Sequence, residues 1–307
     1  MTKPRILFMG TPDFAVPTLS ALIGAGYPVV GVCCQPDKPQ GRHFVLTPPP
    51  VKVLAEKHNI PVYQPATLRD EAVQAELSAL APDFIVVAAY GKILPPAVLG
   101  IPVRGCINVH GSLLPRYRGA APIQRAVMND EVTTGVTIMN MEEGLDTGAM
   151  YLQKSLVIGE DETAGELFDR VAELGAAALL EVLESFDTIT PVPQDDSLAT
   201  WASPLKKEEG KIDWSQDAKA IYARIRGVTP WPGAYTTFGG KRLKIHRARP
   251  VNRCGVTAES LNGDGFIVAC GHGALELLEV QPEGGRRMPA ADFMRGARIT
   301  EGAHFGD

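Results

Sequence analysis

The sequence predicts an α/β fold in which an open, mostly parallel sheet is followed by a smaller β domain. Three observations support this prediction. Short apolar runs alternate with helical patterns in the first half, a proline-rich stretch then interrupts the pattern, and glycine turns separate strand-like runs in the remainder. Alternating strand and helix signals are typical of βαβ units, whose parallel sheet is covered on both faces.

The first half contains apolar runs expected as strands, with helical patterns between them. The expected strands are Ile6–Met9, Val29–Cys34, Phe84–Ala89, Gly105–Val109 and Val136–Met141. The expected helices cover residues 14–25, 51–58, 69–80 and 119–129. A longer helix follows, because Thr163 and Glu166 have the spacing of a capping box. Its apolar stripe consists of Leu167, Val171, Leu174 and Ala178.

Proline and small polar residues interrupt the pattern from about 188 to 205 and predict a linker. We therefore expect a first domain at 1–188, a linker at 189–205 and a second domain at 206–307. Turn signals in the second domain separate four strand-like runs, as in a small barrel or sandwich. These runs are Ala234–Phe238, Leu243–Ala248, Gly265–Cys270 and Ala274–Val280.

Charge is distributed unevenly along the chain. The net charge of −5 divides into −9 for residues 1–205, with 14 Lys+Arg and 23 Asp+Glu, and +4 for residues 206–307, with 16 and 12. No acidic residue lies between Asp217 and Glu259, whereas nine basic residues do. This asymmetry indicates either a surface that binds a polyanion or a solvated charged face.

Composition and motifs exclude several protein classes. With 45% hydrophobic and 21% charged residues the chain is globular in composition, and no apolar run is long enough to span a membrane. The first residues lack the patterns of signal and transit peptides, so we expect a cytoplasmic protein. Five cysteines without CxxC spacing favour buried thiols over disulfides or zinc ligands. The first strand ends in GTPDF, which lacks the glycines of a dinucleotide site.

The densest polar signal lies at the end of a predicted strand. Asn108 and His110 are two residues apart, so their side chains share one face of the strand. Open α/β sheets bind their ligands at the carboxyl ends of strands. The alternative is a hydrogen-bonded core pair, and the position at a strand end favours a functional site. Asp146, in the glycine-bracketed loop GLDTG, is either a turn residue or a carboxylate that orients the imidazole.

An amide donor, an imidazole and a carboxylate suit carbonyl chemistry that passes through an oxyanion. No Ser or Cys nucleophile is evident beside them, so an external nucleophile would attack directly. The residues therefore predict transfer of an acyl-type group and leave the identity of that group open.

Longer motifs resemble a known family. GCINVHGSLLPRYRGAAPIQ, TGVTIM and GLDTG are similar to the 10-formyltetrahydrofolate-dependent formyltransferases. The motifs GTPDFAVPTLSAL, QPDKPQGR, VAAYGKILP, KKEEGKIDWS and PWPG extend the similarity over nearly the whole chain, and it is greatest to members that act on methionyl-tRNA. The resemblance implies a Rossmann-like catalytic domain followed by an OB-like β-barrel. It also implies transfer of formyl from 10-formyltetrahydrofolate to the α-amino group of methionyl initiator tRNA, for translation initiation.

The resemblance implies roles for the matched residues. Asn108 and His110 would stabilise the oxyanion, and Asp146 would hold His110 and help a proton move from the amine to folate N10. The folate site would comprise Ser112, Leu113, Leu114 and Pro115, with Tyr90, Gly91, Ile93 and Leu94. No metal and no NAD are implied. The expected partners of this protein, taken as a monomer, are reduced folate and initiator methionyl-tRNA, without a membrane.

An insertion after the second strand, residues 35–52, would enter the acceptor end of the tRNA, with Arg42 on the acceptor stem. The sequence departs from the family pattern there, because GRHFVL stands where GRGKKL is common and two lysines are missing. Phe44 would stack on a splayed base. Further tRNA contacts are expected from Lys206, Lys207, Lys211, Lys241, Arg242, Lys244 and Arg247.

Three alternatives share the folate chemistry: formyl transfer to a nucleotide-sugar amine, formyl transfer to glycinamide ribonucleotide, and hydrolysis of formyl-folate. The chain length disfavours the glycinamide enzymes, and the QPDKPQGR insertion disfavours the sugar-amine enzymes. A fourth alternative, an RNA-binding protein with an inactive transferase domain, is disfavoured because Asn108, His110 and Asp146 are all present.

Overall fold

The structure, a computed structural model, describes residues 3–40, 44–261 and 265–306. Contacts between Cα atoms group the chain into two compact units. Unit 1 comprises 1–119, 134–156 and 168–201, and unit 2 comprises 120–133, 157–167 and 202–307. The domain bounds expected from the sequence, at 188 and 206, stay a prediction.

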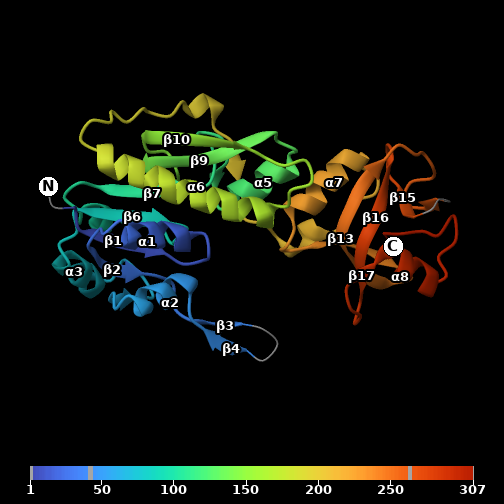
Figure 1. The fold of residues 1–307 in the computed structure, drawn as a ribbon, viewed down its shortest axis with the longest axis horizontal. Helices are drawn as coiled ribbons and strands as arrows, with labels where there is room; N and C mark the ends of the chain where they lie inside the picture. Colours follow the sequence, from blue (N-terminus) through green and yellow to red (C-terminus); the bar gives the residue numbers. More distant parts are fainter. Residues whose placement is uncertain (1–2, 41–43, 262–264, 307) are drawn as a thin grey trace. The chain divides into compact units, whose positions relative to one another are not determined.

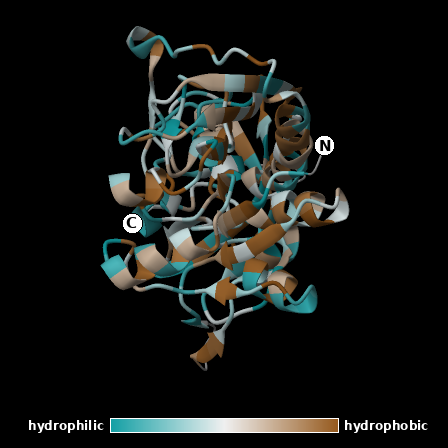
Figure 2. Cartoon of the chain, turned by 90° about the vertical axis from the view of Figure 1, so that its left-hand side faces the viewer, coloured by the Kyte–Doolittle hydropathy of each residue, from teal (hydrophilic) through white to brown (hydrophobic). Residues whose placement is uncertain are grey.

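Unit 1 is built on a seven-stranded sheet in the order β10-β9-β7-β6-β1-β2-β5 (Figure 1). Neighbouring strands from β5 to β7 run parallel, whereas β9 is antiparallel to β7. The strands are β1 (Ile6–Gly10), β2 (Val29–Cys33), β5 (Val62–Tyr63), β6 (Phe84–Ala88), β7 (Cys106–His110), β9 (Thr133–Asn140) and β10 (Met150–Val157). Figure 2 shows the apolar residues concentrated on these strands and on the helices beside them. The predicted mostly parallel sheet is confirmed.

The helices of the first 200 residues include the four short ones expected and the longer one after them. They are α1 (Ala15–Gly24), α2 (Pro50–Lys57), α3 (Glu71–Ala79), α4 (Pro96–Leu99), α5 (Pro122–Met128) and α6 (Ala164–Ser185). The capping box is confirmed, since Thr163 N donates to Glu166 Oε2 at 2.9 Å and Glu166 N to Thr163 Oγ1 at 3.3 Å. Within the described residues, no helix has both the length and the apolar character needed to cross a membrane.

Glycine allows α6 to lie close to the sheet. A Cβ atom at Gly175 would stand 2.6 Å from Val109 Cγ1 of β7, a distance that real Cβ atoms do not reach. Val109 therefore faces α6. Because side chains alternate along a strand, Asn108 and His110 face the opposite side of the sheet.

Two strand pairs and both edge strands of the large sheet, β5 and β10, were not expected from the sequence. The pairs are a hairpin of β3 (Lys38–Gln40) and β4 (Val45–Thr47) after β2, and β8 (Arg118–Gly119) with β11 (Trp201–Ala202). β10 was missed because its residues are exposed and half-buried in alternation, without a continuous apolar run. Two short 3-10 helices, η1 (Asp196–Leu198) and η2 (Lys207–Gly210), lie further along the chain.

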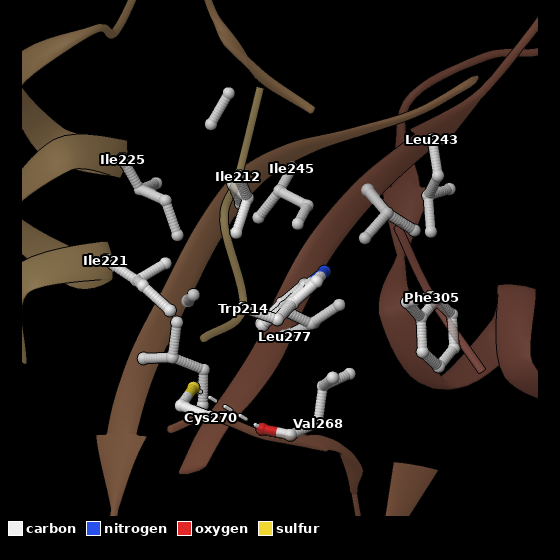
Figure 3. Close-up of a cluster of buried hydrophobic side chains, with 14 of the residues drawn as sticks. Ile212, Trp214, Ile221, Ile225, Leu243, Ile245, Val268, Cys270, Leu277 and Phe305 are labelled. Atoms are coloured by element: carbon white, nitrogen blue, oxygen red, sulfur yellow. Dashed lines mark hydrogen bonds between the residues drawn. The ribbon is translucent and has the colours of Figure 1, made fainter. Parts of the chain in front are cut away.

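Unit 2 contains a separate antiparallel sheet in the order β12-β13-β16-β15-β14, with β17 against β16. Its strands are β12 (Ala234–Phe238), β13 (Lys241–Val251), β14 (Ser260–Leu261), β15 (Phe266–Ala269), β16 (Ala274–Pro282) and β17 (Met288–Pro289). Figure 3 shows the core against this sheet, where Trp214 lies among Ile212, Ile245 and Leu277. The indole Nε1 donates to Thr236 Oγ1 at 2.9 Å. The predicted β-rich second half is confirmed.

The helices α7 (Ala218–Gly227) and α8 (Ala290–Gly296) were not expected from the sequence. α7 begins at an Asp217 cap that accepts from Lys219 N, and it buries Ile221 and Ile225. The same segment carries Arg224 and Arg226, so its positive charge concealed an amphipathic pattern of apolar residues at helical spacing.

Four of the five cysteines are buried and Cys254 is exposed. Burial raises the pKa of Cys33 to about 11 and the pKa values of Cys34, Cys106 and Cys270 to about 12. The thiolate is the reactive form, so these four thiols should be inert at neutral pH. We expect iodoacetamide at pH 8 to modify one cysteine of the native protein, Cys254, and all five after denaturation. Rapid loss of two or more native thiols, counted by mass spectrometry, would contradict this prediction.

Candidate active site

β7 carries two polar side chains in the interior of the sheet. It lies between β6 and β9, with Val87 and Met139 as the neighbours of Asn108 in the two adjoining strands. Asn108 is 9% exposed and His110 is 6% exposed. No hydrogen bond to the side chain of Asn108 is found among the described residues. Its amide is therefore available to a ligand.

Both ring nitrogens of His110 face oxygen atoms. Nε2 lies 3.0 Å from the carbonyl oxygen of Tyr117, which can only accept, so Nε2 carries a proton. Nδ1 lies 3.6 Å from Asp146 Oδ1, slightly beyond hydrogen-bond distance. The carboxylate of Asp146 is therefore the acceptor that faces Nδ1.

The Tyr117 carbonyl is turned toward His110 by an uncommon backbone conformation. Tyr117 has φ of 60°, a left-handed value that is rare for bulky residues. Such conformations persist only where the surroundings hold them, and they cluster at active sites. Ser112 takes part, because its buried hydroxyl donates to Arg116 O at 2.7 Å and lies 3.5 Å from Tyr117 O.

Asp146 is held by its own loop, between β9 and β10. Its backbone is left-handed, with φ of 54°, and its Oδ2 accepts from the Gly119 amide at 2.8 Å. A Cβ atom at Gly148 would lie 2.0 Å from the carbonyl oxygen of Asn140, so only glycine fits there. The side chain of Asp146 is 12% exposed. The structure thus brings the carboxylate of Asp146 next to the ring of His110.

Two residues that the sequence did not single out support the Asp146 loop. Gln194 Nε2 donates to the carbonyl oxygens of Asp146 and Gly148, both at 2.8 Å. Gln194 Oε1 accepts from Arg118, whose guanidinium is buried. Gln194 lies in the stretch predicted as a linker, where no periodicity marked it.

The residues expected to bind folate occupy two loops that follow adjacent parallel strands, β6 and β7. In the first, the side chains of Tyr90 and Leu94 are buried, whereas Gly91 is exposed and Ile93 is 81% exposed. Gln35 Nε2 holds this loop by donating to the carbonyl oxygens of Tyr90 and Gly91, at 3.2 and 3.1 Å.

In the second loop Ser112 and Leu114 are buried, while Leu113 and Pro115 are half-buried. Thr137 Oγ1 fixes the backbone, since it donates to Ser112 O at 2.7 Å and accepts from Leu114 N at 3.1 Å. The side chains of Leu114, Tyr90 and Leu94 therefore belong to the core. Across the part of the chain that is described, no group of three or more His, Cys, Asp or Glu side chains is arranged to hold a metal ion.

Of the residues expected to contact tRNA, Arg42 lies outside the described residues. The others are all exposed: Lys206, Lys207, Lys211, Lys241, Arg242, Lys244 and Arg247. Three of them, Lys207, Arg242 and Lys244, line a cavity of about 260 Å³ together with Trp231. Trp231 is 53% exposed, and the Arg242 guanidinium lies 4.0 Å from the centroid of the Tyr235 ring.

Part of the basic run is engaged within the protein. Arg226 is buried and pairs with Asp130 at 2.6 Å, and Arg249 pairs with Glu276 at 2.6 Å. On the hairpin, Phe44 is 79% exposed. Lys52, at the end of the 35–52 insertion, pairs with Asp37 at 2.9 Å, and hydrogen bonds from Gln64 and then from Lys52 keep the pKa of Asp37 below its ordinary value.

Comparison with known proteins identifies the family. The formyl transferase model matches residues 4–183, and the model of the formyl transferase C-terminal domain matches 204–298. A methionyl-tRNA formyltransferase of Geobacter metallireducens is 50% identical over 310 residues, with 100% of both chains covered. One of Citrifermentans bemidjiense is 51% identical, covering 100% of this chain and 98% of the relative.

A solved structure shares the fold at low identity. It is the N-formyltransferase of Helicobacter canadensis in complex with folinic acid and dTDP-3-aminofucose, with a TM-score of 0.68 and 18% identity, covering 90% of this chain and 99% of that one. The chain belongs to the formyl transferase family and, within it, to the methionyl-tRNA formyltransferases.

Proposed function

We propose that the protein transfers the formyl group of 10-formyltetrahydrofolate to the α-amino group of methionyl initiator tRNA in the cytoplasm, and so supplies N-formylmethionyl-tRNA for translation initiation. The observation that carries this proposal is the placement of His110 Nδ1 3.6 Å from Asp146 Oδ1, beside Asn108, in a chain 50% identical to a methionyl-tRNA formyltransferase over its full length.

The oxyanion is the charge that the site has to stabilise. When the amine attacks the formyl carbon, the carbonyl oxygen becomes negative, and preorganised donors lower the energy of that state. The amide of Asn108 has no partner among the described side chains, so it supplies the hydrogen bond. His110 is proposed to stabilise the oxyanion together with Asn108, with its ring held between Tyr117 O and the Asp146 carboxylate.

Proton transfer accompanies the exchange of bonds. The amine nitrogen forms a bond to the formyl carbon, the bond from that carbon to folate N10 breaks, and one proton passes from the amine to N10. An ordinary α-amine has a pKa of about 8, so a useful fraction is neutral at cytosolic pH. Asp146 accepts the amine proton and returns it to N10, through water.

Folate binding is proposed for the loops after β6 and β7. Their buried side chains fix the backbone, which leaves main-chain groups to pair with the edges of the pterin and the exposed Ile93 and half-buried Leu113 to contact its faces. Both loops follow the carboxyl ends of parallel neighbours, the usual ligand position in such sheets.

An RNA surface is proposed for unit 2. The cavity lined by Lys207, Arg242 and Lys244 presents cations for phosphate, and Trp231 presents a flat ring on which a base can stack. Within the 35–52 insertion, Arg42 is proposed for the acceptor stem, and the 79% exposed ring of Phe44 for stacking.

Salt dependence tests the RNA surface. Each cation that contacts a phosphate contributes roughly 0.9 to the slope of log K against log salt. We expect Lys244→Ala to reduce that slope by about 1, with folate affinity unchanged. Arg249→Ala is the matched control on the same strand, because Arg249 is paired with Glu276 and should change the slope much less. Equal slopes for wild type and Lys244→Ala would remove this surface from the proposal.

The decisive assay gives the purified protein 10-formyltetrahydrofolate and four acceptors: initiator methionyl-tRNA, elongator methionyl-tRNA, a nucleotide-linked amino sugar, and water alone. We expect rapid formation of N-formylmethionine on the initiator tRNA, and far slower reaction with the other three. Faster formylation of the sugar, or folate release without an acceptor, would favour one of the alternative activities instead.

A further inference from the structure

Gln194 connects the predicted linker to the loop of Asp146. Its amide group makes four hydrogen bonds: Nε2 donates to Asp146 O and Gly148 O at 2.8 Å, and Oε1 accepts from Arg118 Nε at 3.1 Å and Nη2 at 2.8 Å. A guanidinium only donates and carbonyl oxygens only accept, so these partners fix the orientation of the amide. Every polar atom of the side chain is engaged.

The segment around Gln194 is anchored on both sides. Two residues earlier, Val192 exchanges backbone hydrogen bonds with Met150, each of 2.8 Å. Two residues later, Asp196 accepts from Arg118 Nη2 at 2.6 Å, although its own side chain is 80% exposed. Met150 begins β10, directly after the Asp146 loop. The amide of Gln194 is therefore held in place relative to that loop.

We propose that Gln194 is a positioning residue, which together with the buried Arg118 holds the left-handed turn of Asp146 and so keeps its carboxylate against His110. The inference rests on the proposed function, because it assigns Asp146 its part in formyl transfer. The backbone of Asp146 needs contacts that hold it, because its φ of 54° is a left-handed conformation that an L residue keeps only when its surroundings stabilise it. Gln194 binds the carbonyl of that same residue.

Kinetics of Gln194→Ala test the proposal. Small displacements of a catalytic group can cost up to about 10²-fold in rate. We expect kcat to fall by about 10–100-fold, while KM for the formyl-folate and for initiator methionyl-tRNA stays within about twofold. Gln194→Glu keeps the acceptors for Arg118 and loses both donors to the Asp146 loop, so its kcat should fall as far as that of Gln194→Ala. It provides a second test of the proposal if the alanine variant fails to fold.

Asp196→Asn is the matched control. It removes only the negative charge of an 80% exposed carboxylate, keeps an oxygen that can accept from Arg118 Nη2, and leaves Gln194 intact. We expect its kcat to stay within about twofold of wild type. If Asp196→Asn lowers kcat as far as Gln194→Ala does, the effect belongs to the segment as a whole and the proposal is wrong.

A double-mutant cycle separates positioning from general structural support. If Gln194 acts through Asp146, then Gln194→Ala has no further effect on kcat once Asp146→Asn is present. If Gln194 had a merely structural role, its replacement would lower kcat by the same factor in both backgrounds, and that result would overturn the proposal.

Hydrogen exchange of the Gly119 amide gives a readout that does not depend on any reaction. This amide donates to Asp146 Oδ2, so its protection reports where the carboxylate lies. We expect it to exchange at least about 10-fold faster in Gln194→Ala and as in wild type in Asp196→Asn. Unchanged protection would refute the positioning role even if the protein formylates tRNA, whereas faster exchange in a protein inactive on tRNA would refute only the proposed function.

Discussion

Asn108→Ala is expected to lower kcat by about 10²–10³-fold, the usual loss when one donor to an oxyanion is removed. In the proposed mechanism the amide of Asn108 is the hydrogen-bond donor to the oxyanion, because both nitrogens of His110 face other oxygens. Single-turnover formylation of initiator methionyl-tRNA measures the chemical step, and titration with a reduced folate measures binding, which should stay near the wild-type value.

Asn108→Asp separates chemistry from packing. Aspartate has the shape of asparagine but no N–H, and it adds negative charge beside the developing oxyanion. We therefore expect it to be slower than the alanine variant. If the isosteric aspartate were the more active of the two, the loss would reflect the shape of the buried side chain, and the oxyanion role would be wrong.

Asp146→Asn is the second variant with a large expected effect. Its amide oxygen can still accept from Gly119, so the turn should survive, but the neutral amide cannot take up the amine proton. Loss of a positioned acid or base typically costs on the order of 10²–10⁴-fold. We expect kcat to fall within that range, with KM for both substrates little changed.

The control for this substitution is again Asp196→Asn, which makes the same chemical change at an exposed carboxylate. The melting temperatures of the two variants should be close to that of wild type. A single-turnover rate for Asp146→Asn within a few-fold of wild type would show that proton transfer bypasses this carboxylate.

The sequence predicted the strand that carries the site and the pair on its face. Period-two alternation placed Asn108 and His110 together, and their burial in β7 agrees with it. Nothing in the periodicity joined Asp146 to His110. That pairing came from the resemblance, because a loop residue far along the chain reaches the site only through tertiary folding.

The residues that support the site could not be predicted from the sequence, and the reasons are physical. Tyr117 contributes a carbonyl oxygen, which every residue has, and only its φ of 60° directs that oxygen to the imidazole. Gln194 lies in a stretch of proline and small polar residues, whose lack of periodicity predicted only a linker. In unit 2, the charge of Arg226 indicated a surface, whereas the side chain is buried against Asp130.

The left-handed turn at Asp146 restricts which amino acids can occupy that position, independently of the reaction. Glycine adopts positive φ freely, asparagine and aspartate adopt it at a smaller cost than other L residues, and β-branched residues do so poorly. A glutamate would bring a carboxylate, but on a longer arm and a backbone that resists this conformation. Saturation mutagenesis would then recover folded, inert clones with glycine or asparagine, and aspartate would be the one acid that satisfies both the turn and the chemistry.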